Sequence, residues 1–75
     1  MNEIFFIVEN DPEGGYTAKS LYGDFSIFTE ADSIPDLKKN IMAALDCQFE
    51  NENDIPKIIR LHYVKDEILN YAPAS

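Results

Sequence analysis

The sequence has little of the chemistry that holds very small proteins together. Its 75 residues contain one cysteine, one histidine and no tryptophan. The single Cys47 excludes an internal disulfide, and one Cys with His62 cannot supply the four soft ligands of a structural zinc site. Because a chain of this length buries only roughly 60% of the surface that its unfolded form exposes, we expect self-association to add stability.

Basic residues and long apolar runs are also scarce. Six Lys and Arg stand against fourteen Asp and Glu, a net charge of −8. This charge repels phosphate backbones and anionic lipid headgroups and favours a basic partner. No apolar run approaches the ~20 residues of a membrane span, and the N-terminus lacks the basic flank and cleavage site of a signal peptide. We therefore expect a cytoplasmic protein that contacts neither DNA nor membrane through this chain.

The residues that are present predict one folded domain over residues 1–75. Apolar residues make up 45% of the chain, which is too much for an acidic disordered segment. Runs rich in strand-forming residues alternate with stretches rich in turn-forming residues, such as Tyr22-Gly23-Asp24. The predicted strands span residues 3–9, 16–21 and 25–29. These runs predict an antiparallel three-stranded meander.

The hydrophobic period then changes to that of a helix. Ser33 can accept a backbone hydrogen bond as N-cap, Pro35 fits the first turn, and Asp36 favours the positive end of the helix dipole. Apolar residues recur every three or four positions and predict one buried stripe, namely Ile34, Leu37, Ile41, Ala44, Leu45 and Phe49. The polar stretch 50–54 predicts the end of this helix.

A fourth strand is predicted over residues 57–64, with Ile59, Leu61 and Tyr63 on one face. After it, residues 66–69 suggest one helical turn, and the tail is expected to fray from about residue 70 to residue 75. The order is β-β-β-α-β, an α+β fold with one helix packed on the three-stranded sheet and with a fourth strand after the helix.

One helix can cover only one face of that sheet. The first strand, however, carries apolar residues on both faces, which predicts that it is buried on both sides. Either the fourth strand and tail wrap around the second face, or another copy of the protein covers it. We favour the second copy, with Phe5 and Ile7 as self-association residues in a dimer or larger assembly.

No arrangement of residues in the sequence indicates catalysis. His62 alternates outward on a strand, and the acidic loop after Cys47 disfavours a thiolate there. Gly14 and Gly15 precede a strand, so they form a turn and not a nucleotide loop. The acidic clusters lack the central Gly and closing Glu of a calcium loop. We predict that the protein is not an enzyme and uses no cofactor or metal.

Two alternatives remain open at this point. Lys57, Arg60 and Lys65 lie along the last predicted strand with Tyr63, which weakly suggests a sheet that stacks the bases of single-stranded RNA. The surrounding negative charge opposes this interpretation. The other alternative is a regulatory domain that responds to a small ligand, which would need a convergent polar site.

Two stretches of the chain resemble the N-terminal domain of HicB-type antitoxins. The first is residues 4–18, IFFIVENDPEGGYTA, an apolar strand, an acidic turn with paired glycines, then Tyr and a strand of small residues. The second is residues 25–37, FSIFTEADSIPDL, similar to the third strand and capped helix start of that family. The likeness covers roughly residues 3–50, and residues 60–68 resemble the ending of small stand-alone members without the DNA-binding domain.

The resemblance implies a truncated ribonuclease H-like fold without catalytic residues, and a partner. That partner is HicA, a small basic ribonuclease toxin that such antitoxins mask. Combined with the negative charge, it predicts an acidic, toxin-facing surface with two aromatic anchors. The residues we expect to contact the toxin are Glu9, Asp11, Glu13, Tyr16, Tyr22, Glu30 and Asp32.

Overall fold

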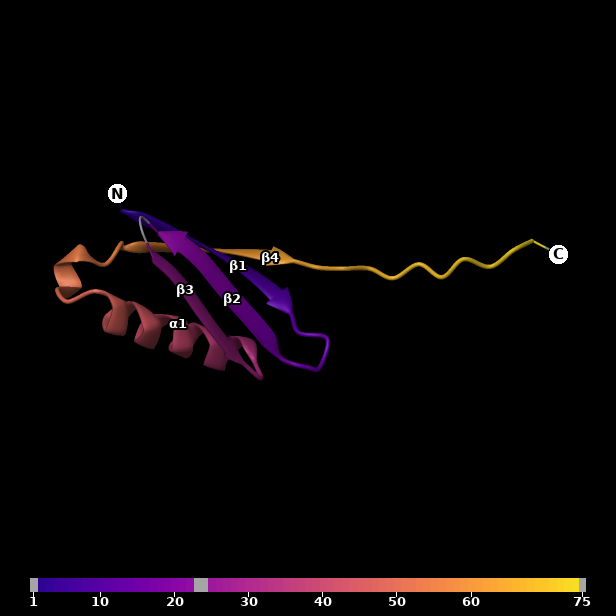
Figure 1. Ribbon diagram of the computed structural model, residues 1–75, viewed down its shortest axis with the longest axis horizontal. Helices are drawn as coiled ribbons and strands as arrows, with labels where there is room; N and C mark the ends of the chain where they lie inside the picture. The colour runs from indigo at the N-terminus through magenta and orange to yellow at the C-terminus, as the bar shows by residue number, and fades with distance from the viewer. Residues whose placement is uncertain (1, 23–24, 75) are drawn as a thin grey trace.

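The computed structural model describes residues 2–22 and 25–74, with the side chains of all of these except Tyr22 and Phe25. The predicted α+β class and the element order β-β-β-α-β are confirmed (Figure 1). The elements are β1 (Glu3–Asn10), β2 (Tyr16–Tyr22), β3 (Phe25–Ala31), α1 (Ile34–Gln48), the short 3₁₀-helix η1 (Glu52–Asp54) and β4 (Ile58–Val64). The turn expected at Gly23 and Asp24 lies outside the described residues.

The four strands form one mixed sheet in the order β3-β2-β1-β4. β1, β2 and β3 make the predicted antiparallel meander. β4 instead pairs in parallel with β1, from Glu3 opposite Ile58 to Glu9 opposite Val64. The parallel direction arises because α1 returns the chain to the end of the sheet where β1 begins, and Ile58 N donates to Asn2 O there at 2.8 Å (Figure 1).

The core lies between one face of the sheet and α1. β1 contributes alternate residues to it, as the period of a strand requires, and α1 contributes the predicted stripe. The buried apolar residues are Ile4, Phe6, Val8, Ala18, Ile27, Leu37, Ile41 and Leu45. Ser20, a buried polar residue of β2, donates through its hydroxyl to the carbonyl of Phe5. We call the sheet face toward α1 the inner face and the opposite one the outer face.

The start of α1 is fixed by side-chain hydrogen bonds. Asp36 N donates to Ser33 Oγ at 3.3 Å, which confirms Ser33 as the N-cap, and Pro35 sits in the first turn. Asn40 Nδ2 donates to Glu30 O at 2.9 Å and ties the helix to β3. Neither helix in the described part of the chain has the length and apolar character needed to span a bilayer.

Two sequence-based predictions differ from the structure. β1 is buried on its inner face only: Phe5, on the outer face, is 44% exposed, because no element of the chain covers that side of the described sheet. The helical turn predicted at residues 66–69 is also absent. Residues 65–74 carry neither helix nor strand and extend away from the domain (Figure 1), since an isolated turn without tertiary contacts does not repay its nucleation cost.

Candidate functional site

The turn between β1 and β2 holds its acidic residues in a defined geometry. Asp11 N donates to Gly15 O at 3.0 Å and Gly14 N to Asp11 O at 2.9 Å. Glu13 N donates to Asp11 Oδ1 at 2.9 Å. The Asp11 carboxylate therefore fixes the loop backbone and also contributes a negative charge. Gly14 and Gly15 have φ of 106° and 85°, values that glycine adopts without steric cost. The loop therefore presents Glu13 from a fixed backbone.

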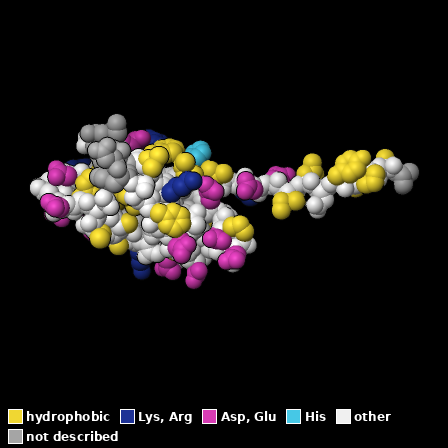
Figure 2. Space-filling view, in the orientation of Figure 1, with side chains coloured by type: hydrophobic (Ala, Val, Ile, Leu, Met, Phe, Trp, Pro, Cys, Tyr) yellow, Lys and Arg dark blue, Asp and Glu magenta, His cyan; other side chains and the backbone are white. Residues whose placement is uncertain are grey.

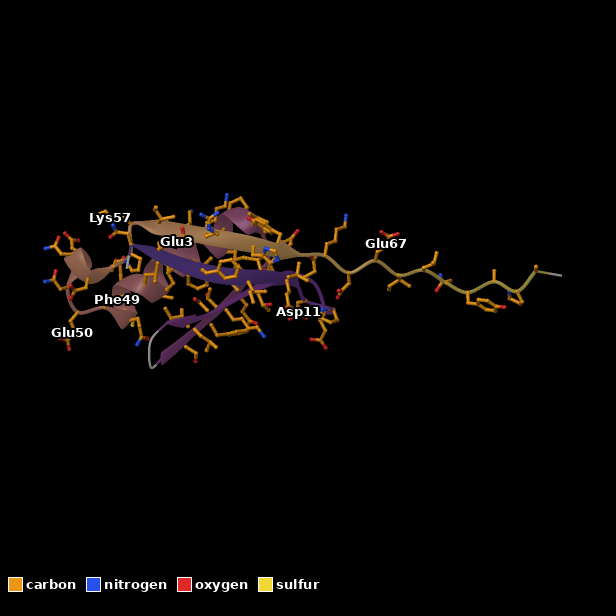
Figure 3. All side chains as sticks on the ribbon, turned by 90° about the horizontal axis from the view of Figure 1, so that it is seen from above. Glu3, Asp11, Phe49, Glu50, Lys57 and Glu67 are labelled. Carbon is orange, nitrogen blue, oxygen red and sulfur yellow. The ribbon has the colours of Figure 1, made fainter. Side chains whose placement is uncertain are left out.

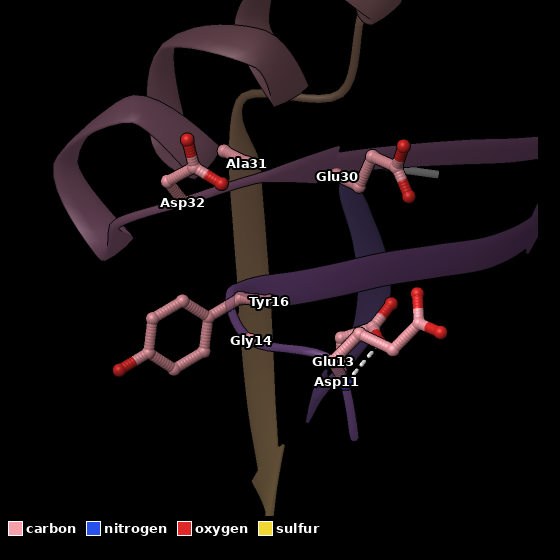
Figure 4. Close-up of a pocket in the computed structure, with 7 residues that line it drawn as sticks. All are labelled: Asp11, Glu13, Gly14, Tyr16, Glu30, Ala31 and Asp32. Carbon is pink, nitrogen blue, oxygen red and sulfur yellow. Dashed lines mark hydrogen bonds between the residues drawn. The ribbon is translucent and has the colours of Figure 1, made fainter.

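Beside this turn, a hollow of about 440 Å³ opens at the end of the sheet (Figure 4). Tyr16 pairs with Ala31 across β2 and β3, so the start of β2 and the end of β3 reach the hairpin turn together. We call this feature the acidic hollow, and its lining residues are Asp11, Glu13, Gly14, Tyr16, Glu30, Ala31 and Asp32.

Four carboxylates and Tyr16 line the acidic hollow, and Figure 4 shows them on two sides of the sheet end: Tyr16 and Asp32 point to one side, and Asp11, Glu13 and Glu30 point to the other. Glu13, Glu30 and Asp32 are exposed, and Asp11 is half-buried. None of the residues lining the hollow is a Lys or Arg. Like charges gathered on one surface produce a local negative potential that attracts cationic groups and is screened by salt. The hollow is thus suited to electrostatic attraction of a basic surface.

The structure brings five of the seven predicted partner-binding residues together in the acidic hollow. Glu9 lies in a neighbouring cleft of about 410 Å³, which shares Tyr16 with the hollow and includes Tyr63 and Lys65 at the end of β4. Tyr22 stands at the opposite end of β2 from Tyr16, and its side chain lies outside the described residues.

Several residues that line these two cavities are not among those predicted to contact the partner. Ala31 lines the hollow because it pairs with Tyr16, and Tyr63 and Lys65 line the neighbouring cleft because β4 ends beside β1. Each of these residues is placed by the pairing of strands that are distant in the chain. Residue type alone does not predict such pairing.

The outer face of the sheet carries a second surface of different character. A groove of about 490 Å³ runs across β1, β2 and β3, lined by Phe5, Ile7, Lys19, Ser20, Leu21, Ser26, Ile27 and Phe28. Leu21 is 86% exposed and Phe28 is 63% exposed. We call this surface the outer groove. The predicted self-association residues Phe5 and Ile7 both lie in it.

Next to the outer groove, two side-chain contacts link β1 to β4. Phe5 and His62 stack with ring centroids 5.7 Å apart. Arg60 Nε and Nη2 donate to the two carboxylate oxygens of Glu3 at 3.0 and 3.1 Å. The hydrogen bond from Arg60 lowers the pKa of Glu3, and the same bond raises the pKa of Arg60. Both contacts are solvent-exposed, so they fix geometry more than they add stability.

The cysteine and the histidine lie on different sides of the domain. His62 is exposed on the outer face, whereas Cys47 is exposed on α1, which covers the inner face. Within residues 2–22 and 25–74 no group of three or more His, Cys, Asp or Glu side chains could hold a metal ion.

The fold and these surfaces define a class: a small α+β protein with an acidic hollow at one end and an uncovered apolar sheet face. The chain belongs to the UPF0150 family. It is 42% identical over 55 residues to a UPF0150 protein of Archaeoglobus fulgidus, covering 73% of this chain and 77% of that protein. It is 36% identical over 64 residues to a UPF0150 protein of Thermotoga maritima, covering 85% and 86%.

Comparison with family models gives no match for the chain. No solved structure matches it either.

Proposed function

We propose that this protein is a non-enzymatic, cytoplasmic interaction module that masks a small basic protein, as HicB-type antitoxins mask HicA-type ribonuclease toxins. The observation that carries the proposal is the convergence of Asp11, Glu13, Glu30 and Asp32 around the acidic hollow. These residues come from the hairpin turn and from the end of β3, so folding alone concentrates them. The resemblance of residues 4–18 and 25–37 to HicB-type antitoxins supplies the class of partner.

Charge and aromatic surface have separate roles in this proposal. The exposed carboxylates steer the basic partner by long-range attraction, which acts mainly on the association rate. Tyr16 packs partly against the core and also lines the hollow, and its exposed part anchors the partner once it has docked, because aromatic residues commonly carry the energy of an interface. The protein thus occupies the substrate-binding surface of a ribonuclease and needs no catalytic group.

The same module associates with itself through apolar surface. Support comes from the outer groove, where Phe5, Ile7 and Phe28 form an apolar surface that no element of the described chain covers. Apolar surface of this kind commonly marks an interaction site.

A charge-reversal variant tests the masking proposal. Glu13→Lys/Glu30→Lys/Asp32→Lys keeps Asp11, whose carboxylate holds the turn, and reverses the three exposed charges of the hollow. Its association rate with a purified HicA-type toxin should fall by about one to two orders of magnitude. Added salt should also slow association of the unchanged protein. Stopped-flow binding measures both effects, and inhibition of RNA cleavage by the toxin measures masking.

The matched control is Glu50→Lys/Glu52→Lys/Asp54→Lys. It changes the net charge by the same amount on exposed residues of the segment after α1, and Figure 3 shows Glu50 of this segment at the other end of the domain from Asp11. We expect its association rate to change much less. Equal slowing by both variants would show that net charge and not the hollow steers the partner, and a toxin that binds without salt dependence would refute the mechanism.

A further inference from the structure

The C-terminal tail exposes large apolar side chains on an extended backbone. Residues 65–74 follow β4 without further secondary structure, and the tail projects from the domain with apolar groups along its length (Figures 1 and 2). Ile68 is 85% exposed, Leu69 91% and Tyr71 88%. Exposed apolar groups gathered in one segment mark a contact with another surface.

β4, which precedes the tail, has a free edge. It ends the sheet order β3-β2-β1-β4 and pairs along one side only, with β1. A free edge presents unpaired backbone N–H and C=O groups, and proteins usually block it with proline, a bulge or a covering segment. β4 reads IIRLHYV and has no proline. The edge is therefore able to accept one more strand.

An apolar groove lies beside this free edge on the inner face. α1 packs mainly on β3 and leaves the inner side of β4 incompletely covered. Ile59 and Leu61 are half-buried, and Met42 of α1 is 54% exposed. Together with Lys38 and Ile41 they line a groove of about 280 Å³, which we call the α1/β4 groove.

We propose that two copies of this protein exchange their tails: residues 65–71 of each copy run antiparallel along the free edge of β4 in the other copy, and Leu69 and Tyr71 fill its α1/β4 groove. Strand alternation supports the match. If the tail continues the alternation of β4, residues 67, 69 and 71 face the same side as Ile59 and Leu61.

Charge and symmetry support the same arrangement. Glu67 faces the groove side of the sheet in this alternation, and the groove carries Lys38 in its lining. Lys38 lies in the N-terminal half of α1, at the end of the sheet where β4 finishes and where an incoming antiparallel tail starts. A two-fold axis between the two β4 strands makes both exchanges at once, and such symmetric pairing is the usual form of a homodimer.

A tail folding back on its own β4 is the competing arrangement. It would require a tight hairpin immediately after Val64, where the sequence reads Lys65-Asp66-Glu67. Two-residue hairpin turns favour Asn-Gly, Asp-Gly or Gly-Gly, and no glycine follows β4 in this chain. A longer turn would consume residues that must pair. A second copy avoids both costs because the tail remains straight.

Sedimentation equilibrium of the full chain tests the exchange. We expect at least a dimer, with a mass of twice the 8.5 kDa chain mass or more at micromolar concentration. Leu69→Ser/Tyr71→Ser should raise its dissociation constant at least about a hundredfold, because two apolar side chains per copy lose their groove. Both residues are almost fully exposed within one chain, so the domain itself should keep its circular dichroism spectrum.

A matched variant and a second measurement separate this surface from the outer groove. Leu21→Ser removes a leucine that is 86% exposed in the outer groove and should leave the tail-exchanged dimer intact. Alternate amide hydrogens of residues 65–71, those that point toward the partner's β4, should exchange slowly in the dimer and rapidly in Leu69→Ser/Tyr71→Ser. A monomeric wild type, a dimer that the tail variant leaves unchanged, or a dimer with unprotected tail amides would each overturn the proposal.

Discussion

At the scale of single residues, the hairpin turn depends most on Gly15. Its φ of 85° is a conformation that other residues rarely adopt, and a Cβ added there would lie 2.8 Å from Ala31 O, a backbone atom of the neighbouring chain segment. That distance is shorter than van der Waals contact, so the backbone would have to move. Ala31 and Asp32 line the acidic hollow, and Gly15 therefore permits the close approach that builds it.

Gly15→Ala should destabilise the fold by about 1–3 kcal/mol, because backbone strain and a backbone contact act together. Urea unfolding followed by circular dichroism measures the change. Gly14→Ala is the matched control: Gly14 also has a positive φ, 106°, but a Cβ there would meet no atom within 4 Å. The smaller loss of unfolding free energy expected for Gly14→Ala measures backbone strain alone. Equal losses for the two variants would show that the contact with Ala31 does not contribute.

At the scale of elements, α1 is the most important support of the sheet. Leu37 and Ile41 are 0% and 1% exposed and pack into the core formed by β1, β2 and β3. Leu37→Ala or Ile41→Ala should each cost about 2–5 kcal/mol, since each leaves a cavity among buried side chains. Met42→Ala, on the same helix but 54% exposed, should cost much less. A loss of unfolding free energy below about 0.5 kcal/mol at Leu37 or Ile41 would place the stripe outside the core.

The elements that the sequence predicts well are those set by local periodicity. The stripe of Leu37, Ile41 and Leu45 and the N-cap at Ser33 follow from spacing and side-chain type within one helix. Such patterns are sufficient because the residues that define them are neighbours in the chain.

Pairing between distant segments could not be predicted in this way. The parallel pairing of β4 with β1 depends on the end of the sheet to which α1 returns the chain. The residues of β4 do not themselves indicate the direction of this pairing. The acidic hollow was predicted in part, because Asp11 and Glu13 are close in the chain, but their approach to Glu30 depends on the register of β2 with β3. Tyr22 illustrates the limit: seven residues of strand place it at the opposite end of β2 from Tyr16.

At the scale of the whole molecule, the acidic hollow and the two apolar grooves are lined by different residues. The acidic hollow occupies the end of the domain that carries the hairpin, while apolar surface lies over the outer groove and along the tail (Figure 2). This arrangement allows the two kinds of contact to operate together: a basic partner at the hollow competes with neither the α1/β4 groove nor the outer groove for the same residues.

The parallel pairing of β1 with β4 also sets an order of events during folding. Glu3 and Arg60, which meet across this pair, are 57 positions apart, so their contact closes nearly the entire chain into a loop. The meander and α1 need only shorter closures and should form first, with β4 joining after the rate-limiting step.

Leu61→Ala should then accelerate unfolding while leaving the folding rate nearly unchanged. Stopped-flow kinetics measure both rates in the Leu21→Ser/Leu69→Ser/Tyr71→Ser background, which weakens association through both the outer groove and the tail. A folding rate that drops in proportion to the lost stability would instead place β4 in the nucleus. If β4 docks last, each newly made chain passes through a form in which one edge of β1 is still unpaired. In that form β1 can pair with a strand of another chain. Docking of β4 covers this edge and so ends the risk of wrong pairing.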